Sequence, residues 1–264
     1  MPMTKTVQPD IDYQIHQSVA EIALNHGPAN ALSEAMIGRL IAALDRARAD
    51  DQVRAVIVHS AVPGVFCAGI DLKRLVGAEA ETFRALLDQL YTGLTEAQHR
   101  LGKPCIAAIA GAARGGGMTL AISCDLIVAG HSASFGYPEI ELGVLPAIHF
   151  THLPRIVGRY RAFDLLFTGR SFDAAEAQAL GLVSRVADDD KVLDEARALA
   201  QVLAAKAPGA MRLGHAAFHQ ATDQGYRQGV FGAVETFCHS ALAAEGREGL
   251  AAFADKRPPT WRQG

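Results

Sequence analysis

The chain has 264 residues, 50% of them hydrophobic and 20% charged, so it is long enough to bury one substantial core. Its formal net charge of −3 gives no electrostatic basis for binding nucleic acid or an anionic membrane surface. No apolar run approaches the roughly 20 residues of a membrane span, and the first ten residues lack the apolar core of a signal peptide. Residues 1–9 are expected to form a loose tail.

Cysteine usage indicates a reducing compartment. The four cysteines show no CxxC spacing and lie mainly in apolar surroundings, at Cys67, Cys105, Cys124 and Cys238. We therefore expect free thiols, a cytoplasmic location and no metal site.

Strand and helix signals alternate through the first hundred residues. Apolar segments of strand length lie within residues 10–25, and His26-Gly27-Pro28 interrupts them. Ser33 can cap a helix whose apolar residues recur at helical spacing, namely Ile37, Leu40, Ile41 and Leu44. The next three segments are predicted as a buried strand, a glycine-containing loop and a long amphipathic helix, at residues 54–59, 61–71 and 78–101.

Residues 103–141 form the most distinctive segment. Apolar runs at residues 105–110 and 126–129 predict two buried strands, and between them lie Gly115-Gly116-Gly117 and an apolar helix over residues 118–124. Each glycine would cost roughly 0.8–1.0 kcal/mol in a helix interior relative to Ala, so a strand-to-helix junction suits them better. The unpaired N–H groups and the positive dipole end of a helix N-terminus can bind a phosphate or a developing oxyanion there.

The glycine triplet has a structural interpretation beside the functional one. A tight turn that packs a helix against a strand accounts for it without any ligand. The phosphate-binding patterns GxxxxGK[ST] and GxGxxG do not fit the spacing. An oxyanion hole is the functional interpretation that remains.

The C-terminal third is predicted to be mainly helical. Residues 153–167 predict a helix with a basic face. Asp173 and Glu176 have the spacing of a capping box that opens another helix. From residue 188 onward the sequence is Ala-rich and carries no strand signal.

The segment KPCIAAIAGAARGGGMTLAISCDLIVAGHSASFGYPEIELGVLP closely resembles the core motif of the crotonase (enoyl-CoA hydratase/isomerase) superfamily. Flanking segments match in the same order: ALNHGPANALS at residues 23–33, FCAGIDLK at 66–73, TGRSFDAAEAQALGLVSRV at 168–186 and, more weakly, EGREGLAAFADKRPPTW at 245–261. The resemblance covers nearly the whole chain. It implies an α/β fold of the crotonase type, with a ββα spiral core over residues 1–203 and a helical trimerisation region over residues 204–264.

The resemblance also implies where an acyl-CoA would bind. The N–H groups of Ile70 and Gly116 match the two donors of an oxyanion hole for the thioester oxygen. Other residues match positions that contact the substrate or its coenzyme A, namely Ala29, Ala31, Ala68, Asp71, Leu72, Lys73 and Thr119. Phe253 and Lys256 match positions that reach the coenzyme A of a neighbouring subunit. These matches imply a homotrimer or a dimer of trimers, no permanently bound cofactor, and coenzyme A that enters as part of the substrate.

Glu139 is the candidate catalytic base. It follows the second buried strand in a weakly charged segment, where apolar surroundings raise a carboxyl pKa and make a better base near neutrality. By itself, a Glu after Pro is more typical of a helix cap or an ion pair, but the resemblance implies that Glu139 is one of two glutamates that handle protons in the hydratases. At the position of the other glutamate this chain has Thr119. His149 and His152 follow and could titrate near pH 6.5, and a catalytic role for His149 stays open.

The leading hypothesis is Δ3,Δ2-enoyl-CoA isomerisation, with Glu139 as the proton shuttle. The first alternative is an enoyl-CoA hydratase for an unusual acyl chain that recruits another group for water. The second alternative is a catalytically silent relative that only binds CoA esters or a protein partner.

Overall fold

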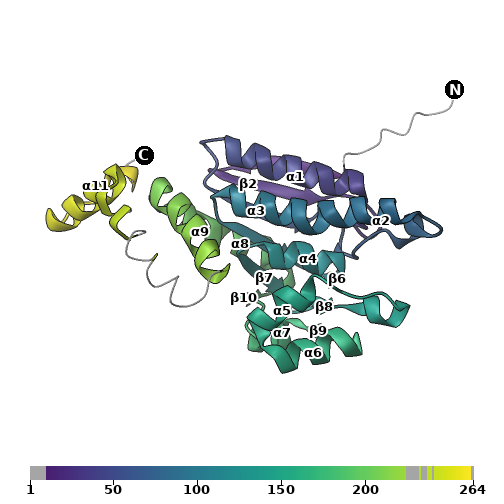
Figure 1. Ribbon diagram of the computed structural model, residues 1–264. Helices are drawn as coiled ribbons and strands as arrows, with labels where there is room; N and C mark the ends of the chain where they lie inside the picture. The colour runs from purple at the N-terminus through teal and green to yellow at the C-terminus, as the bar shows by residue number, and fades with distance from the viewer. Residues whose placement is uncertain (1–9, 224–231, 233–236, 240, 263–264) are drawn as a thin grey trace.

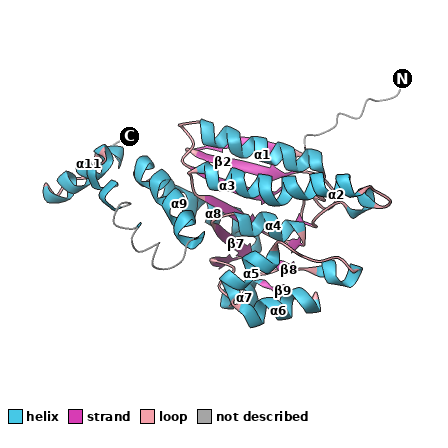
Figure 2. Ribbon diagram, viewed as in Figure 1, coloured by secondary structure: helices cyan, strands magenta, loops and turns pink. Residues whose placement is uncertain are grey.

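The strands form two sheets, and helices surround them (Figures 1 and 2). The computed structural model describes residues 10–223, 232, 237–239 and 241–262, so the tail expected at residues 1–9 lies outside the described range. The larger sheet contains, in spatial order, β1 (Ile11–His16), β2 (Val19–Leu24), β3 (Ala55–Ser60), β5 (Cys105–Ile109), β7 (Leu126–Gly130) and β10 (Arg185–Ala187). The smaller sheet contains β4 (Val65–Cys67), β6 (Ala112–Arg114), β8 (Ser134–Gly136) and β9 (Ser171–Asp173). Only the two outer pairs, β1–β2 and β8–β9, are antiparallel among the described strands.

The chain passes repeatedly from the larger sheet to the smaller one. β3 is followed by β4, β5 by β6, and β7 by β8, and one or more helices follow each pair of strands. Because each turn of this path adds one strand to both sheets, the architecture is a ββα spiral. The fold predicted from the resemblance is confirmed for this part of the chain.

Alternate residues of one strand serve two different cores, because successive side chains point to opposite faces of a sheet. Val56 and Val58 of β3 belong to the larger core cluster, which also contains buried residues of α1 (Glu34–Ala49) and α3 (Leu94–Leu101). Ala55 and Ile57 belong to a second cluster, which packs against α8 (Val192–Ala204). The strand is therefore apolar on both faces, as the sequence predicts.

The helices next to the first two strand pairs agree with the prediction. Ser33 caps α1, since its side-chain oxygen accepts a hydrogen bond from the Met36 N–H. The helix predicted over residues 78–101 is present as α2 (Ala80–Leu87), a π-helical segment η2 (Asp88–Gly93) and α3. The glycine triplet opens α4 (Gly116–Ser123), with Gly115 at the cap position.

Two details of the prediction were wrong. The single helix expected over residues 153–167 is two helices, α5 (His149–Val157) and α6 (Arg159–Thr168), because Gly158 between them has a φ of +84° that no α-helix accommodates. The capping box at α7 (Ala174–Ala179) is only half formed. Asp173 accepts from the Glu176 N–H, but the Glu176 carboxylate binds Arg170 instead of the cap residue.

The last part of the described chain is helical, as expected. It comprises α9 (Pro208–Asp223), α11 (Ala244–Ala254) and the short turn η5 (Thr260–Arg262). α11 packs against α9 and lies beyond it, on the side of the molecule away from α2 (Figure 1). Among the described residues, no helix is both long enough and apolar enough to cross a bilayer.

Candidate active site

Two loops that are far apart in the sequence lie side by side through backbone hydrogen bonds. The Ala68 N–H donates to the Ala29 carbonyl (3.0 Å), the Leu32 N–H donates to the Gly69 carbonyl (2.7 Å), and the Asp71 N–H donates to the Leu32 carbonyl (3.0 Å). The structure thereby brings together four of the residues predicted to contact coenzyme A, namely Ala29, Ala31, Ala68 and Asp71.

Asn30 holds the first of these loops in place. Its fully buried amide donates to Ser60 Oγ (2.8 Å) and to the Phe66 carbonyl (2.9 Å), and its Oδ1 accepts from the His26 N–H (2.8 Å). Its φ of +50° lies in the left-handed region, which Asn tolerates better than most residues. Replacing this side chain would leave several buried polar groups without partners.

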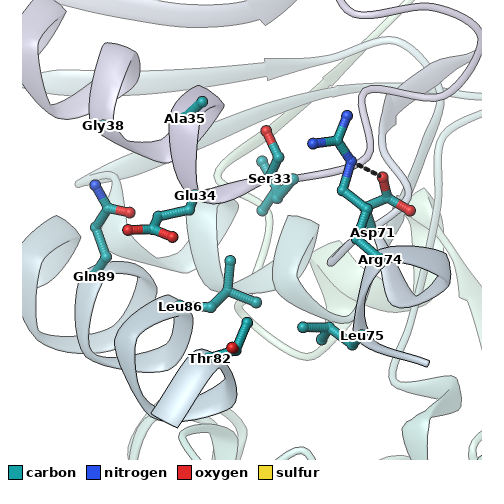
Figure 3. Close-up of a pocket in the computed structure, with 11 residues that line it drawn as sticks. Ser33, Glu34, Ala35, Gly38, Asp71, Arg74, Leu75, Thr82, Leu86 and Gln89 are labelled. Atoms are coloured by element: carbon teal, nitrogen blue, oxygen red, sulfur yellow. Dashed lines mark hydrogen bonds and ion pairs between the residues drawn. The ribbon is translucent and has the colours of Figure 1, made fainter. Parts of the chain in front are cut away.

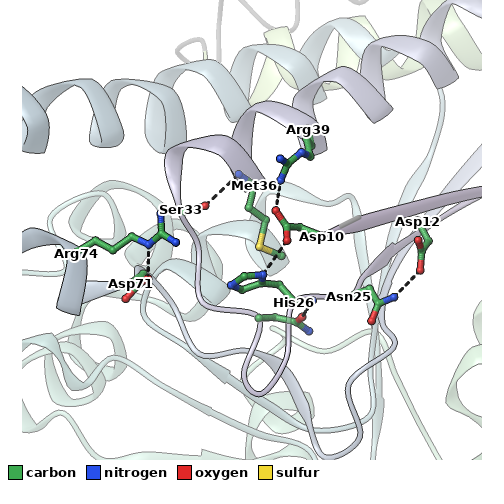
Figure 4. A network of polar contacts seen from close by, with 10 residues as sticks. Asp10, Asp12, Asn25, His26, Ser33, Met36, Arg39, Asp71 and Arg74 are labelled. Carbon is green, nitrogen blue, oxygen red and sulfur yellow. Dashed lines mark hydrogen bonds and ion pairs between the residues drawn. The ribbon is translucent and has the colours of Figure 1, made fainter. Parts of the chain in front are cut away.

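A polar network ties this loop to the first strand and to α1 (Figure 4). Asp10 accepts from His26 Nδ1 (2.8 Å) and forms an ion pair with Arg39 of α1, while Asn25 Nδ2 donates to Asp12 (2.8 Å). The loop that carries Ala29 and Ala31 is therefore fixed at its N-terminal end.

The backbone nitrogens of Ile70 and Gly116 lie close together. Since Leu32 bonds to the residues on either side of Ile70, the Ile70 N–H faces away from Leu32, as in any parallel bridge. A Cβ built on Gly116 would lie 3.4 Å from the Ile70 nitrogen. Because a Cβ is only about 2.5 Å from its own nitrogen, the two nitrogens are at most roughly 6 Å apart, a gap that one oxygen can bridge with two hydrogen bonds of about 2.9 Å.

Gly69 permits this approach. Its φ is +95°, and a Cβ at this position would lie 2.9 Å from the Arg114 carbonyl oxygen and 3.1 Å from the Gly116 nitrogen. Gly116 occupies the first turn of α4, where N–H groups have no intrahelical partner. Neither N–H of the pair makes a hydrogen bond to the protein in the described residues. Both donors are thus available to an oxygen of a bound molecule.

The Glu139 carboxylate lies against the glycine triplet. It belongs to the 3-10 turn η3 (Pro138–Leu142), and its Oε1 would be 2.6 Å from a Cβ placed on Gly115. Its Oε2 is buried and has no hydrogen-bond partner among the described residues. Burial raises the pKa of Glu139, because the surroundings disfavour its charged form. A carboxylate with these properties is a suitable proton acceptor next to the two N–H donors.

Two tyrosines lie near this carboxylate, and an apolar side chain lies against the adjacent glycine. Leu90 is fully buried and would touch a Cβ on Gly116 at 3.3 Å. Burial, reinforced by the negative charge of Glu139, raises the pKa of both Tyr91 and Tyr137. The buried Tyr137 hydroxyl makes no hydrogen bond within the described chain. Water is largely excluded on this side of the carboxylate, which strengthens electrostatic interactions there.

Thr119 and His149 form a buried pair on the next helices. Thr119 Oγ1 lies 3.2 Å from His149 Nε2, and the direction of this hydrogen bond depends on the histidine tautomer. The His149 ring also packs on Tyr137, with ring centroids 4.6 Å apart. Burial, and to a lesser extent the neighbouring His152, lower the pKa of His149 to about 3. The imidazole is therefore neutral near pH 7, and sequence inspection alone did not predict its contact with Thr119.

Comparison with known proteins identifies the family. The family model described as enoyl-CoA hydratase/isomerase matches residues 14–264. The chain belongs to the enoyl-CoA hydratase/isomerase family. The crotonase-type fold predicted from the sequence is thus also the fold of its relatives.

Three relatives illustrate how closely this family member matches others. "Enoyl-CoA hydratase domain-containing protein 2, mitochondrial" of Bos taurus is 42% identical over 253 residues, which cover 92% of this chain and 84% of the relative. A Mycobacterium leprae protein described as a probable enoyl-CoA hydratase is 37% identical over 246 residues, covering 92% of this chain and 94% of the relative. The crystal structure of an enoyl-CoA hydratase from Bacillus anthracis superposes with a TM-score of 0.90 at 32% identity, covering 97% of this chain and 100% of that one. This family member is therefore a hydratase-type enzyme.

A pocket of about 530 Å³ adjoins the paired loops of this enoyl-CoA hydratase/isomerase family member (Figure 3). It lies between the start of α1, the short helix η1 (Leu72–Leu75) and α2. Its lining comprises Leu32, Ser33, Glu34, Ala35, Gly38, Asp71, Arg74, Leu75, Thr82, Leu86 and Gln89. Glu139 and Gly116 are not part of this lining, so the pocket shares only the loop residues Leu32 and Asp71 with the site described above.

Some residues predicted to contact coenzyme A lie apart from Glu139. Leu72 and Lys73 are exposed on η1, next to Arg74, which forms an ion pair with Asp71 at 2.9 Å. Phe253 is 86% exposed on α11, and Lys256 follows that helix. The structure therefore does not bring Phe253 and Lys256 to the site of their own chain, and their contact with a neighbouring subunit stays a prediction.

Proposed function

We propose that this enoyl-CoA hydratase/isomerase family member isomerises 3-enoyl-CoA thioesters to 2-enoyl-CoA thioesters. The supporting observation is the asymmetry of the site. The backbone nitrogens of Ile70 and Gly116 lie close together with one carboxylate near them, Glu139. At the position where the hydratases have their second glutamate, this chain has Thr119, which pairs with the neutral His149. Shuttling one proton needs a single base, whereas addition of water in the family's manner uses two carboxylates.

The proposed reaction consists of two proton transfers. The thioester oxygen accepts from the Ile70 and Gly116 N–H groups, and Glu139 removes a proton from C2 of the 3-enoyl chain. The electron pair moves into a dienolate whose negative oxygen the two donors stabilise, each donor contributing about 2.7–4 kcal/mol in comparable sites. Glu139 then returns the proton to C4, so that the double bond ends between C2 and C3 and the carboxylate is regenerated.

Hydration of a 2-enoyl-CoA is the second candidate function. Two observations favour it: the names of the relatives, and the Thr119–His149 contact of 3.2 Å, which could hold a water molecule in place of the missing glutamate. In this case Glu139 and the Thr119–His149 pair would share the proton transfers. A silent CoA-ester-binding role is the third possibility, and the available N–H donors and the unpartnered Oε2 of Glu139 count against it.

The position of Thr119 gives a test of this choice. Thr119 lies three residues after Gly116, so both share one face of α4. We expect Thr119→Glu to raise the rate of 2-enoyl-CoA hydration relative to 3-enoyl-CoA isomerisation, because it restores a second carboxylate opposite Glu139. Initial rates on both substrates measure this ratio, and Thr119→Gln, which has the same length without the charge, is the control. If the wild type already hydrates 2-enoyl-CoA rapidly, and Thr119→Glu does not raise that rate, the result would favour the hydratase function.

The pH dependence of activity gives a second test. Because burial raises the pKa of Glu139, this base is lost at a higher pH than an ordinary glutamate of about 4.3. Activity should be complete above the raised pKa and should fall about tenfold per pH unit below it. Burial lowers the pKa of His149 to about 3, so its titration should not coincide with this limb. A pH profile of kcat/KM that shows no acid limb above the ordinary glutamate range would argue against Glu139 as the base.

Assembly and location are part of the same proposal. We expect coenzyme A to enter with the substrate along Ala29, Ala31, Ala68 and the exposed residues Leu72 and Lys73. We also expect a homotrimer or a dimer of trimers, in which Phe253 and Lys256 reach a neighbouring active site. The proposed location is the cytoplasm.

A further inference from the structure

Three side chains that the proposed reaction does not use converge at the start of β7. Asp125 immediately precedes this strand, and His215 and His219 lie one turn apart on α9. His215 Nε2 is 3.2 Å and His219 Nε2 is 3.3 Å from Asp125 Oδ1, and the two Nε2 atoms are 3.3 Å from each other. Within the described residues, this is the one group of three such side chains whose ligand atoms lie close enough to share a metal ion.

The dimensions of this triangle match a zinc site. A tetrahedral Zn²⁺ ion with bonds of about 2.0–2.1 Å holds its ligand atoms about 3.3 Å apart. All three edges measured here lie within 0.1 Å of that value. Imidazole nitrogen and carboxylate oxygen are also ligand types that zinc and related divalent ions prefer.

The surrounding structure orients the three ligands. The Cys105 N–H donates to Asp125 Oδ2 at 2.8 Å and fixes the carboxylate. His215 Nε2 is 3.2 Å from both carboxylate oxygens, and His219 Nε2 is 3.3 Å from Oδ1. The His219 ring packs against His99 of α3, with ring centroids 4.5 Å apart and the rings tilted by 37°. The side chains of Asp125 and His219 are 22% and 23% exposed, so an ion can enter and solvent can complete its coordination.

An ion explains the arrangement better than hydrogen bonds alone. Each of the three atoms faces the other two, but only one proton can lie between His215 Nε2 and His219 Nε2. A metal accepts an electron pair from all three atoms at once. The arrangement without metal is an ion pair between Asp125 and a protonated His219, consistent with the raised pKa that this carboxylate gives His219.

We propose that Asp125, His215 and His219 bind a divalent transition-metal ion of the zinc type, with water as the fourth ligand. The site joins α9, the first helix of the C-terminal region, to the larger sheet. The sequence predicted no metal, because the histidine pair becomes informative only once Asp125, ninety positions earlier, is placed beside it.

His215 Nδ1 is buried and has no hydrogen-bond partner in the described chain, so the hydrogen bonding around the metal ligands is incomplete on that side. Such a defect weakens metal binding by about 10–100-fold, and we expect micromolar affinity.

The test uses the full chain, free of affinity tags and treated with EDTA. Titration with Zn²⁺ against a chromophoric chelator should give one tight site per chain. Zn²⁺ at a hundredfold excess over Kd should raise the unfolding temperature by roughly 5–10 °C. Both effects should disappear in His219→Gln and in Asp125→Asn, and they should remain in His131→Gln, which removes an exposed histidine outside the cluster.

A second measurement does not depend on the folding of any variant. Co²⁺ added to the wild-type protein should give the intense visible absorption of tetrahedral coordination, and one equivalent of Zn²⁺ should abolish it. The proposal is overturned if the wild type binds no stoichiometric Zn²⁺, or if binding and the Co²⁺ spectrum are unchanged in His219→Gln. Stability that falls as pH rises through the pKa of His219, without metal binding, would identify an ion pair instead and would also overturn it.

Discussion

Glu139→Gln is expected to lower turnover of an enoyl-CoA by roughly a hundred- to ten-thousand-fold, the usual effect of removing a general base. The amide has nearly the same shape as the carboxylate, but it cannot accept the proton from C2 of the substrate. Substrate binding should be largely kept, because the thioester oxygen is proposed to bind the N–H groups of Ile70 and Gly116. Steady-state kinetics should therefore show a large loss in kcat and a small change in KM.

The matched control is Glu141→Gln, two residues further along the same turn. Glu141 is exposed, so its replacement should leave turnover close to that of the wild type. Folding of both variants can be compared by thermal unfolding. Near-normal turnover by Glu139→Gln would remove Glu139 from the mechanism and would direct attention to His149.

Gly69→Ala is expected to lower kcat by about 10²–10³-fold, the loss caused by one missing oxyanion donor. The new methyl group would lie 3.1 Å from the Gly116 nitrogen and 2.9 Å from the Arg114 carbonyl oxygen. The 2.9 Å distance to backbone is shorter than real Cβ contacts and the 3.1 Å distance is tighter than most of them, so we expect the loop to move away from α4 and the two N–H groups to separate. Glu139 should keep its environment, so the acid limb of the pH profile should stay where it is in the wild type.

Strain at a positive φ could also lower activity by reducing stability, so this prediction needs its own control. Gly64 lies on the other side of the short strand β4 with a φ of +73°, and a Cβ there would meet nothing within 4 Å. Gly64→Ala and Gly69→Ala should both lose about 1–3 kcal/mol of stability from the unfavourable backbone conformation. Only Gly69→Ala should lose turnover of the folded enzyme. Equal losses in the two variants would contradict the role assigned to the donors.

The sequence predicts the elements whose signal is local and strong. The buried strands at β3, β5 and β7, the Ser33 cap and the helix that begins at the glycine triplet all follow from residue type and spacing. The strands of the smaller sheet were not predicted, since β4, β6, β8 and β9 have three residues each. Such short strands carry almost no periodicity, and their existence depends on pairing with one another.

The candidate site was predictable in its backbone and less so in its side chains. Ile70, Gly116 and Glu139 were found because they lie in motifs with a family resemblance, and the structure places them together. Tyr91 and Tyr137 were missed because a buried tyrosine in sequence looks like any other core residue. The contact between Thr119 and His149 was missed because it joins positions thirty residues apart, and no local pattern indicates which face of α5 meets α4.

The most direct test of the central claim is a comparison of initial rates on 3-enoyl-CoA and 2-enoyl-CoA of matched chain lengths, with the products identified. The account predicts that the 3-enoyl thioester is converted to its conjugated 2-enoyl isomer faster than the 2-enoyl thioester is hydrated. Rapid hydration of the 2-enoyl thioester without conversion of the 3-enoyl isomer would contradict the isomerase and establish the hydratase. No turnover of either thioester at any chain length would contradict both.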